Sequence, residues 1–126
     1  MEAHGDVFDV SRGSELEDLI EAIALECGWR VEKRRRHGKR ILDLVLSKGG
    51  VVFIVQAKNK DVAQPRDVSQ TRKDYEEYIN YLIRERLGLR VASILVSRGF
   101  SDGAKRRARG YGVRLYRVEE LRDLLS

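Results

Sequence analysis

The sequence predicts a single α/β domain in which a mixed central sheet is flanked by helices. Segments with apolar residues at helical spacing alternate with short β-branched runs in the order α-β-β-β-α-β-α-β-α. The 126 residues include 42% hydrophobic residues and one Pro, which is typical of one packed domain without repeats. We therefore expect residues 1–126 to form one domain, with residues 1–11 as a loose N-terminal arm.

The first helix is predicted to start at Ser14, with Glu17 completing a capping box. Gly28 supplies the stop, and a short strand over residues 29–33 then leads into a basic run before a turn at residues 37–39. The helix is predicted from apolar residues at helical spacing, namely Leu16, Leu19, Ile20, Ile23, Ala24 and Cys27.

Strands are predicted over residues 40–46 and 51–58, and the Gly49-Gly50 pair between them predicts a tight hairpin. Both glycines accept the positive φ of a type I′ turn. In that hairpin Lys48 faces Val51, so the two residue numbers of every facing pair have the same sum as 48 and 51. The same register places Asp43 opposite Gln56.

The second half of the chain continues the alternation of helices and strands. Pro65 interrupts the chain after the strand over residues 51–58. A long amphipathic helix over residues 67–86 follows and is ended by Gly88. Its predicted apolar side carries Val68, Tyr75, Tyr78, Ile79, Leu82 and Ile83. The remaining elements are a buried strand (91–97), a basic helix capped by Ser101 (101–110), a strand (113–116) and a closing helix (118–125).

Three polar residues interrupt the two apolar hairpin strands. Asp43 lies in an otherwise apolar strand, where an unpaired carboxylate would cost several kcal/mol. Gln56 and Lys58 are two residues apart, so their side chains share one face of the next strand. The predicted register therefore brings all three together. One explanation is structural: an Asp43–Lys58 ion pair with Gln56 as a hydrogen-bonding neighbour.

The other explanation is a metal site. A carboxylate from Asp43, an amide oxygen from Gln56 and the backbone carbonyl of Ala57 form an all-oxygen set that suits Mg²⁺ or Mn²⁺. Lys58 beside such an ion could position or deprotonate an attacking water and stabilise charge on a phosphate.

These residues resemble the D…(D/E/Q)xK motif of the PD-(D/E)xK nucleases, and the Gln variant is typical of the Mrr-like restriction endonuclease group. Segments of the rest of the chain are similar to that group in the same order, and the similarity spans about residues 12–125. They are GSELE at 13–17, GWRV at 28–31, ILVSRGFS at 94–101, the stretch from Ala104 to Val113, and EEL at 119–121.

The resemblance implies a restriction-endonuclease-like αβββαβ core and Mg²⁺- or Mn²⁺-dependent hydrolysis of DNA phosphodiesters, with no small-molecule cofactor. It implies metal ligation by Asp43, Gln56, Ala57 and Glu17, and a catalytic role for Lys58. Glu17 has a second explanation as the capping-box residue, and Glu15 is the weaker candidate. Archaeal Holliday junction resolvases belong to the same superfamily, but they normally have a carboxylate where this chain has Gln56.

Gln56 also leaves a non-catalytic alternative open. An amide removes one charge from the metal shell and should weaken Mg²⁺ binding. A DNA-binding protein built on the nuclease fold, without cleavage, is therefore the second hypothesis.

The net charge of +5 and the pI of about 9.6 permit a polyanionic partner. Basic runs are often simply solvated faces, but here they are also candidates for phosphate contacts. The candidates for contacting DNA are Arg34, Arg35, Arg36, Lys60, Lys105, Arg106, Arg107 and Arg109.

Two further expectations concern location and assembly. Cys27 is the single cysteine, which favours a buried thiol in a reducing cytoplasm, and no segment is apolar enough to predict a membrane span. Because a duplex has two strands to cut, we expect a symmetric homodimer. The candidate interface contains Tyr75, Tyr78, Tyr81 and Leu82, although the tyrosines could equally belong to the core.

Overall fold

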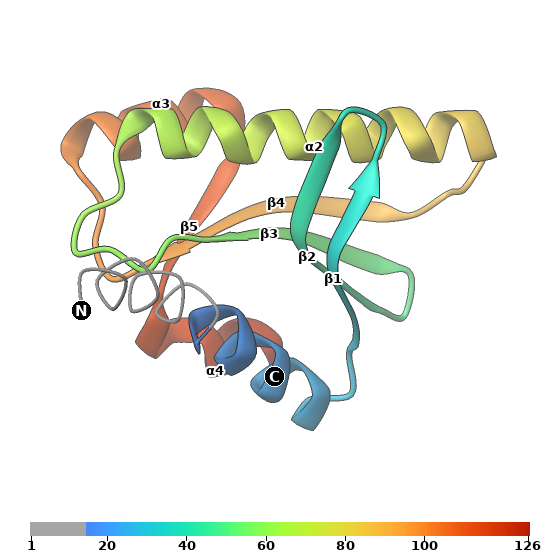
Figure 1. The fold of residues 1–126 in the computed structure, drawn as a ribbon, viewed down its shortest axis with the longest axis horizontal. Coiled ribbons are helices and arrows are strands. Elements are labelled where there is room, and N and C mark those ends of the chain that lie inside the picture. Colours follow the sequence, from blue (N-terminus) through green and yellow to red (C-terminus); the bar gives the residue numbers. More distant parts are fainter. Residues whose placement is uncertain (1–14) are drawn as a thin grey trace, which may run out of the picture.

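The computed structural model describes residues 15–126 and has a five-stranded sheet with helices on both faces (Figure 1). The predicted Ser14 cap and the arm over residues 1–11 lie outside the described residues. After a helix over residues 15–26, the elements are β1 (Arg30–His37), β2 (Arg40–Lys48), β3 (Val51–Ala57), α2 (Pro65–Glu85), β4 (Arg90–Ser97), α3 (Asp102–Tyr111), β5 (Val113–Arg117), a 3-10 turn η1 (Val118–Glu120) and α4 (Leu121–Leu125).

The strands lie in the order β1-β2-β3-β4-β5, and the sheet is mixed, as predicted. β1, β2 and β3 form an antiparallel meander, whereas β4 and β5 run parallel to β3. The parallel pairs follow from the two helical crossovers, because a strand that returns through a helix pairs in parallel with its predecessor.

The hairpin between β2 and β3 has the predicted register. Lys48 pairs with Val51, and Gly49 and Gly50 have φ values of 56° and 82°. Both values lie in the left-handed region that the type I′ turn requires and that glycine adopts at no steric cost. The ladder continues to Leu44 and Val55 and then stops.

Separate apolar clusters fill the two faces of the sheet. On one face the helix over residues 15–26 and α4 cover β2, β3 and β4, and the Trp29 indole donates a 2.9 Å hydrogen bond to the Leu125 carbonyl. On the other face α2 and α3 pack against the sheet through two clusters, one around Leu42, Tyr78 and Leu82 and the other around Val68 and Ala104. Figure 1 shows the two helical layers on opposite sides of β3 and β4.

The hairpin of β1 and β2 rises from the sheet and folds over α2 (Figure 1). The His37 ring lies 5.0 Å from the Tyr78 ring and 4.9 Å from the Tyr81 ring, and Arg40 pairs with Asp74. β1 is therefore longer than predicted, and residues 34–36 of the basic run are part of the strand. Pairing with the apolar strand β2 outweighs the low strand propensity of consecutive arginines.

Two predictions about α2 are wrong. The helix begins at Pro65, since proline is well accommodated in the first turn, where no partner for its nitrogen is needed. Tyr78 and Leu82 are buried in the core of their own domain, with 7% and 4% of their surface exposed, so they cannot form the expected dimer surface. Among the described residues no helix is long and apolar enough to cross a membrane.

Candidate active site

The predicted site lies where β2 separates from β3. Beyond the Leu44–Val55 pair the two strands no longer form a ladder, and the Asp43 carboxylate enters the gap. Its Oδ2 atom accepts a hydrogen bond from the backbone N–H of Ala57 at 3.3 Å. Asp43 thus satisfies a strand N–H that has lost its neighbouring strand, and it lies beside the segment that carries Gln56 and Lys58.

Burial dominates the electrostatics of Asp43. It raises the pKa of the carboxyl above the ordinary value of 3.8, while the Ala57 N–H and the charges of Lys58 and Arg34 act in the opposite direction. Among the described residues Lys58 forms no direct ion pair with Asp43, so the structural explanation based on such a pair is not what the structure contains. The Asp43 carboxylate is partly desolvated, and its cationic neighbours in the described part of the chain are not in direct contact with it. A further cation bound there would therefore stabilise its charge.

Gln56 is buried on the face of β3 that α2 covers. Its Oε1 atom accepts a 2.7 Å hydrogen bond from the Thr71 hydroxyl, and that hydroxyl also lies 2.8 Å from the carbonyl oxygen of Asp67. The Gln56 side chain is therefore held by α2.

Lys58 was predicted as the last residue of the strand, but β3 ends at Ala57, so Lys58 lies directly after it. Its backbone N–H donates to the Val96 carbonyl at 2.9 Å. Its positive charge lowers the pKa of Asp43, Asp67 and Asp74 relative to what burial alone would give. Lys58 thus acts electrostatically on three carboxylates.

Two of these carboxylates, Asp67 and Asp74, are almost completely buried on α2 and were not identified from the sequence. For Asp67, burial raises the pKa, but the ion pair with Lys60 at 2.6 Å and the Gln64 N–H outweigh it, so the pKa is lowered. For Asp74, burial outweighs the paired Arg40, so the pKa is raised. Each carboxylate therefore has its own cationic partner.

Glu17 reaches the same region from the helix over residues 15–26. It is 7% exposed, and its Oε1 atom lies 3.3 Å from the Nε atom of Arg34. Burial and the nearby Asp43 carboxylate raise the pKa of Glu17, whereas Arg34 lowers it. Arg34 has a positive φ of 52°, which is rare for a residue with a side chain and is found at strained functional positions.

The available donors fit a hard divalent cation. Asp43 and Glu17 would supply carboxylate oxygens, Gln56 an amide oxygen and Ala57 a backbone carbonyl, and Mg²⁺ often binds through one or two carboxylates plus water. No group of three His, Cys, Asp or Glu side chains among residues 15–126 is arranged to hold an ion by itself. Ligation would therefore depend on the amide and the carbonyl as well as on the two acids.

The basic residues predicted to contact DNA differ in what they contact. Arg35 pairs with Glu32 at 3.0 Å, Lys60 pairs with the buried Asp67, and Arg107 donates to the Ser69 hydroxyl at 3.1 Å. α3 buries Ala104 and Ala108 and directs its basic side chains outward; those exposed on it are Lys105, Arg106, Arg107 and Arg109. Arg36 on β1 is also exposed.

The start of α3 lies at the same edge of the sheet as Lys58. The predicted Ser101 cap is confirmed, since its hydroxyl accepts from Ala104 at 3.0 Å, and its own N–H donates to Ala63. Gly99 is required in this connection, because a Cβ there would lie 2.6 Å from the backbone oxygen of Asp61. The basic helix α3 therefore begins at the edge of the sheet where Lys58 lies.

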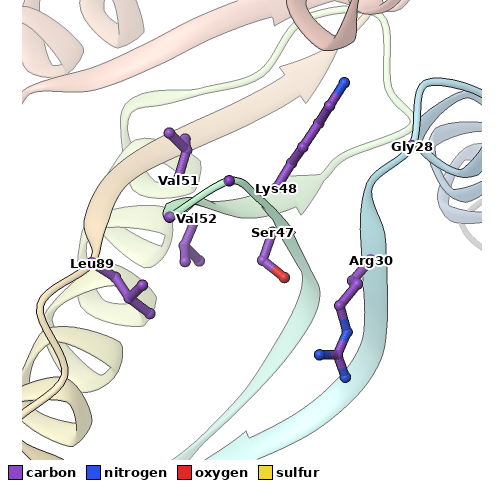
Figure 2. Close-up of a pocket in the computed structure, with 9 residues that line it drawn as sticks. Gly28, Arg30, Ser47, Lys48, Val51, Val52 and Leu89 are labelled. Atoms are coloured by element: carbon purple, nitrogen blue, oxygen red, sulfur yellow. The ribbon is translucent and has the colours of Figure 1, made fainter.

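The pocket in Figure 2 lies elsewhere, at the Gly49-Gly50 turn. It has a volume of about 400 Å³ and contains none of the predicted site residues. It is lined by residues of the turn and its flanking strands, with Gly28, Arg30 and Leu89. The turn is the opposite end of the β2–β3 ladder from Asp43, so this pocket is separate from the candidate site.

The buried row Asp67, Thr71 and Asp74 could have been found in the sequence. These residues are four and three positions apart, so they lie on one face of a helix, and Tyr78 and Leu82 continue that face. Polar residues on the same helix face as buried apolar residues indicate a candidate site, just as Asp43 does in its apolar strand. The prediction instead assigned Tyr75 and Ile83 to the buried side, and Ile83 is 68% exposed.

Comparison with known proteins gives no matching family model and no matching curated protein. Solved structures do match. A repair endonuclease from Pyrococcus abyssi superposes with a TM-score of 0.59 at 22% identity, over 75% of this chain and 40% of that one. EndoMS in a complex with dsDNA gives a TM-score of 0.59 at 22% identity, over 71% and 36%.

A third structure, the protein of unknown function AF1548, gives a TM-score of 0.59 at 13% identity, over 81% of this chain and 57% of that one. The chain thus spans about 40% of the length of the two endonuclease structures. The similarity establishes that this mixed sheet with its flanking helices has the fold found in these three solved structures.

Proposed function

We propose that the protein is a metal-dependent DNA endonuclease that hydrolyses phosphodiester bonds. The observation that carries the proposal is the fork between β2 and β3, where Asp43 binds the Ala57 N–H beside Gln56 and Lys58. The fold shared with a repair endonuclease and with a DNA-bound protein supports the same class of substrate. Fold similarity supports this only by analogy, so the site residues are the main argument.

Within this proposal Asp43, Glu17, Gln56 and the Ala57 carbonyl would hold Mg²⁺ or Mn²⁺. When bound, the ion supplies Lewis-acid stabilisation of the charge that builds on the phosphate. Lys58 positions the attacking water and donates to the phosphate oxygens as their charge increases. Asp67 and Asp74 keep Lys60 and Arg40 in place around the lysine.

DNA would lie across the edge of the sheet that carries both Lys58 and the start of α3. The exposed basic side chains of α3 would bind backbone phosphates and set the position of the duplex, without reading bases. Arg34, which is 61% exposed at the side chain and lies beside Glu17, would bind the phosphate nearest the site.

The finer assignment we propose is to the Mrr-like group of PD-(D/E)xK nucleases, supported by the order of its motifs along the chain. A symmetric homodimer, a twofold pair of chains, would place one active site at each strand of a duplex. Light scattering at micromolar protein, with and without DNA, tests the pair: a dimer in either condition is expected. A monomer in both would refute it.

The test of the proposed activity is a cleavage panel. The substrates are a linear duplex, a methylated duplex, a single strand and a four-way junction, each with Mg²⁺, with Mn²⁺ and with EDTA. We expect cleavage of at least one substrate with an ion and none with EDTA. No cleavage of any substrate with either ion would contradict the proposal.

One observation favours a second function, DNA binding without cleavage: the oxygen of Gln56 is bonded to Thr71 and Gln56 carries no charge. The Gln56→Glu variant separates the two functions. Unchanged or increased cleavage in the variant supports an active metal site. Tight DNA binding by both proteins with cleavage by neither supports the second function.

A further inference from the structure

Thr71 has two neighbours and only one hydroxyl proton. Its Oγ1 atom lies 2.7 Å from the Gln56 side-chain oxygen and 2.8 Å from the Asp67 carbonyl oxygen. A hydroxyl can donate only once but can also accept. Thr71 is fully buried, at 0% exposed, so solvent does not take over either contact.

The Gln56 amide can meet this hydroxyl in two ways that differ by a half-turn of the amide group. With its oxygen toward Thr71, the hydroxyl donates to Gln56, and the amide NH₂ turns toward the rest of the site. With its NH₂ toward Thr71, the hydroxyl accepts from Gln56 and donates to the Asp67 carbonyl. The amide oxygen then turns toward the rest of the site.

The charge at the site decides which orientation is stable. The partial positive charge of an NH₂ group is favoured toward a site whose nearby groups, Asp43 and Glu17, are carboxylates when no cation is bound. The partial negative charge of the oxygen is favoured beside a bound cation. Both orientations leave the Thr71 hydroxyl with a hydrogen-bond partner, so neither carries the cost of an unsatisfied buried polar group.

We propose that Thr71 is a positioning residue that lets the Gln56 amide reverse when a divalent cation binds, with its oxygen toward the ion in the bound state. The proposal rests on the proposed function, because it requires an ion at Asp43. It also distinguishes Gln56 from a carboxylate at this position. A carboxylate has no N–H to offer and would require Thr71 to donate in every state.

The variants are Thr71→Val, which keeps the shape and removes the hydroxyl, and Thr71→Ser, which restores the hydroxyl. Ser69→Ala is the matched control. Ser69 lies on the same helix, and its hydroxyl donates to the Pro65 carbonyl four residues earlier at 3.4 Å, but it does not contact Gln56. All measurements use the full chain without DNA, and thermal melts establish that each variant is folded.

Two readouts apply, namely Mg²⁺ affinity by calorimetry and the NMR signals of the Gln56 side-chain NH₂ during Mg²⁺ titration. In the wild type the NH₂ signals should move during the titration as the group turns toward the Thr71 hydroxyl. Thr71→Val should weaken Mg²⁺ binding about 10-fold, as expected for loss of a group that orients a ligand. Thr71→Ser and Ser69→Ala should bind Mg²⁺ with the wild-type affinity.

Wild-type affinity and wild-type NH₂ shifts in Thr71→Val would overturn the inference while leaving the nuclease proposal intact. If Asp43→Asn also bound Mg²⁺ as tightly as the wild type, the proposed metal site itself would be wrong. Should Thr71→Val not fold, Thr71→Ala compared with Thr71→Ser gives the same test. Equal affinity in that pair would likewise overturn the inference.

Discussion

Asp43 accepts the Ala57 N–H at the point where the ladder between β2 and β3 stops providing a partner. Its carboxylate therefore helps the strands to separate, and the same separation leaves the carboxylate beside Lys58. A half-buried acid of this kind is costly unless a neighbour stabilises its charge. At the residue scale, the local structure and the candidate chemistry thus depend on the same side chain.

Lys58 provides the first prediction. Lys58→Ala should lower the single-turnover cleavage rate about 10²- to 10⁴-fold, because the lysine acts on the reacting groups. DNA affinity, measured by fluorescence anisotropy, should change little, since we propose that the exposed basic residues of α3 supply most phosphate contacts. Lys73→Ala, which removes an exposed lysine on α2, serves as the control and should leave both values unchanged. Cleavage by Lys58→Ala at the wild-type rate would contradict the proposed role.

The polar residues of the strands could be predicted from the sequence, whereas those of α2 were not. Asp43 and Gln56 interrupt apolar strands whose register two glycines determine. Asp67, Thr71 and Asp74 share one helix face with Tyr78 and Leu82, which is a sequence signal, but the prediction gave weight to Ile83, which is exposed. Contacts of this face with β3, with β4 and with the hairpin of β1 and β2 together determine which side of α2 is buried.

That hairpin is the main feature at the element scale. It is held on α2 by Arg40, which pairs with Asp74, and by His37, whose ring contacts two tyrosines. The Nε2 atom of His37 is buried without a hydrogen-bond partner among the described residues. The extension of the hairpin over α2 was not predicted, because the consecutive arginines of β1 give no strand pattern in the sequence. In the structure these arginines pair with β2.

His37 provides the second prediction. Burial lowers the pKa of His37 below 6.5, and the charges of Arg35 and Arg84 add to the effect while Glu32 opposes it. The folded state therefore prefers the neutral ring. The contribution of His37 to stability is fully present above pH 6.5 and is lost as the pH falls from that value toward the lower folded pKa.

His37→Phe keeps an aromatic ring against Tyr78 and Tyr81 and removes the titrating group. The loss of unfolding free energy between about pH 7.5 and about pH 5.5 should be smaller in this variant than in the wild type. Urea denaturation at both pH values measures it. An equal loss in the two proteins would show that His37 titrates alike in the folded and unfolded states.

α3 provides the third prediction. The double variant Arg106→Ala with Arg109→Ala should weaken DNA binding for all sequences alike. It should also reduce the slope of log affinity against log salt by up to about 2. Arg30→Ala with Arg122→Ala removes the same charge from β1 and α4, and should change the slope much less. Equal slopes for the two double variants would show that α3 does not form the DNA-binding surface.

At the scale of the whole molecule, the sheet brings together residues that are distant in the chain. Glu17 comes from the first described helix, Asp43 from β2 and Lys58 from the end of β3, while α3 begins at the same edge. The α/β class and the element order could be predicted because periodicity and turn residues agree along the chain. The packing of the β1–β2 hairpin on α2, which pairs Arg40 with Asp74, could not.

The most direct test of the central claim is cleavage of supercoiled plasmid by the wild type and by Asp43→Asn in Mg²⁺ and in Mn²⁺. Asparagine can still accept the Ala57 N–H, so the variant should fold, but it lacks the charge that a cation requires. We expect the wild type to nick or linearise the plasmid with either ion, and Asp43→Asn to be at least about 10²-fold slower. Equal rates for the two proteins, or no cleavage by the wild type with either ion, would contradict the assignment of the β2–β3 fork as a metal-dependent nuclease site.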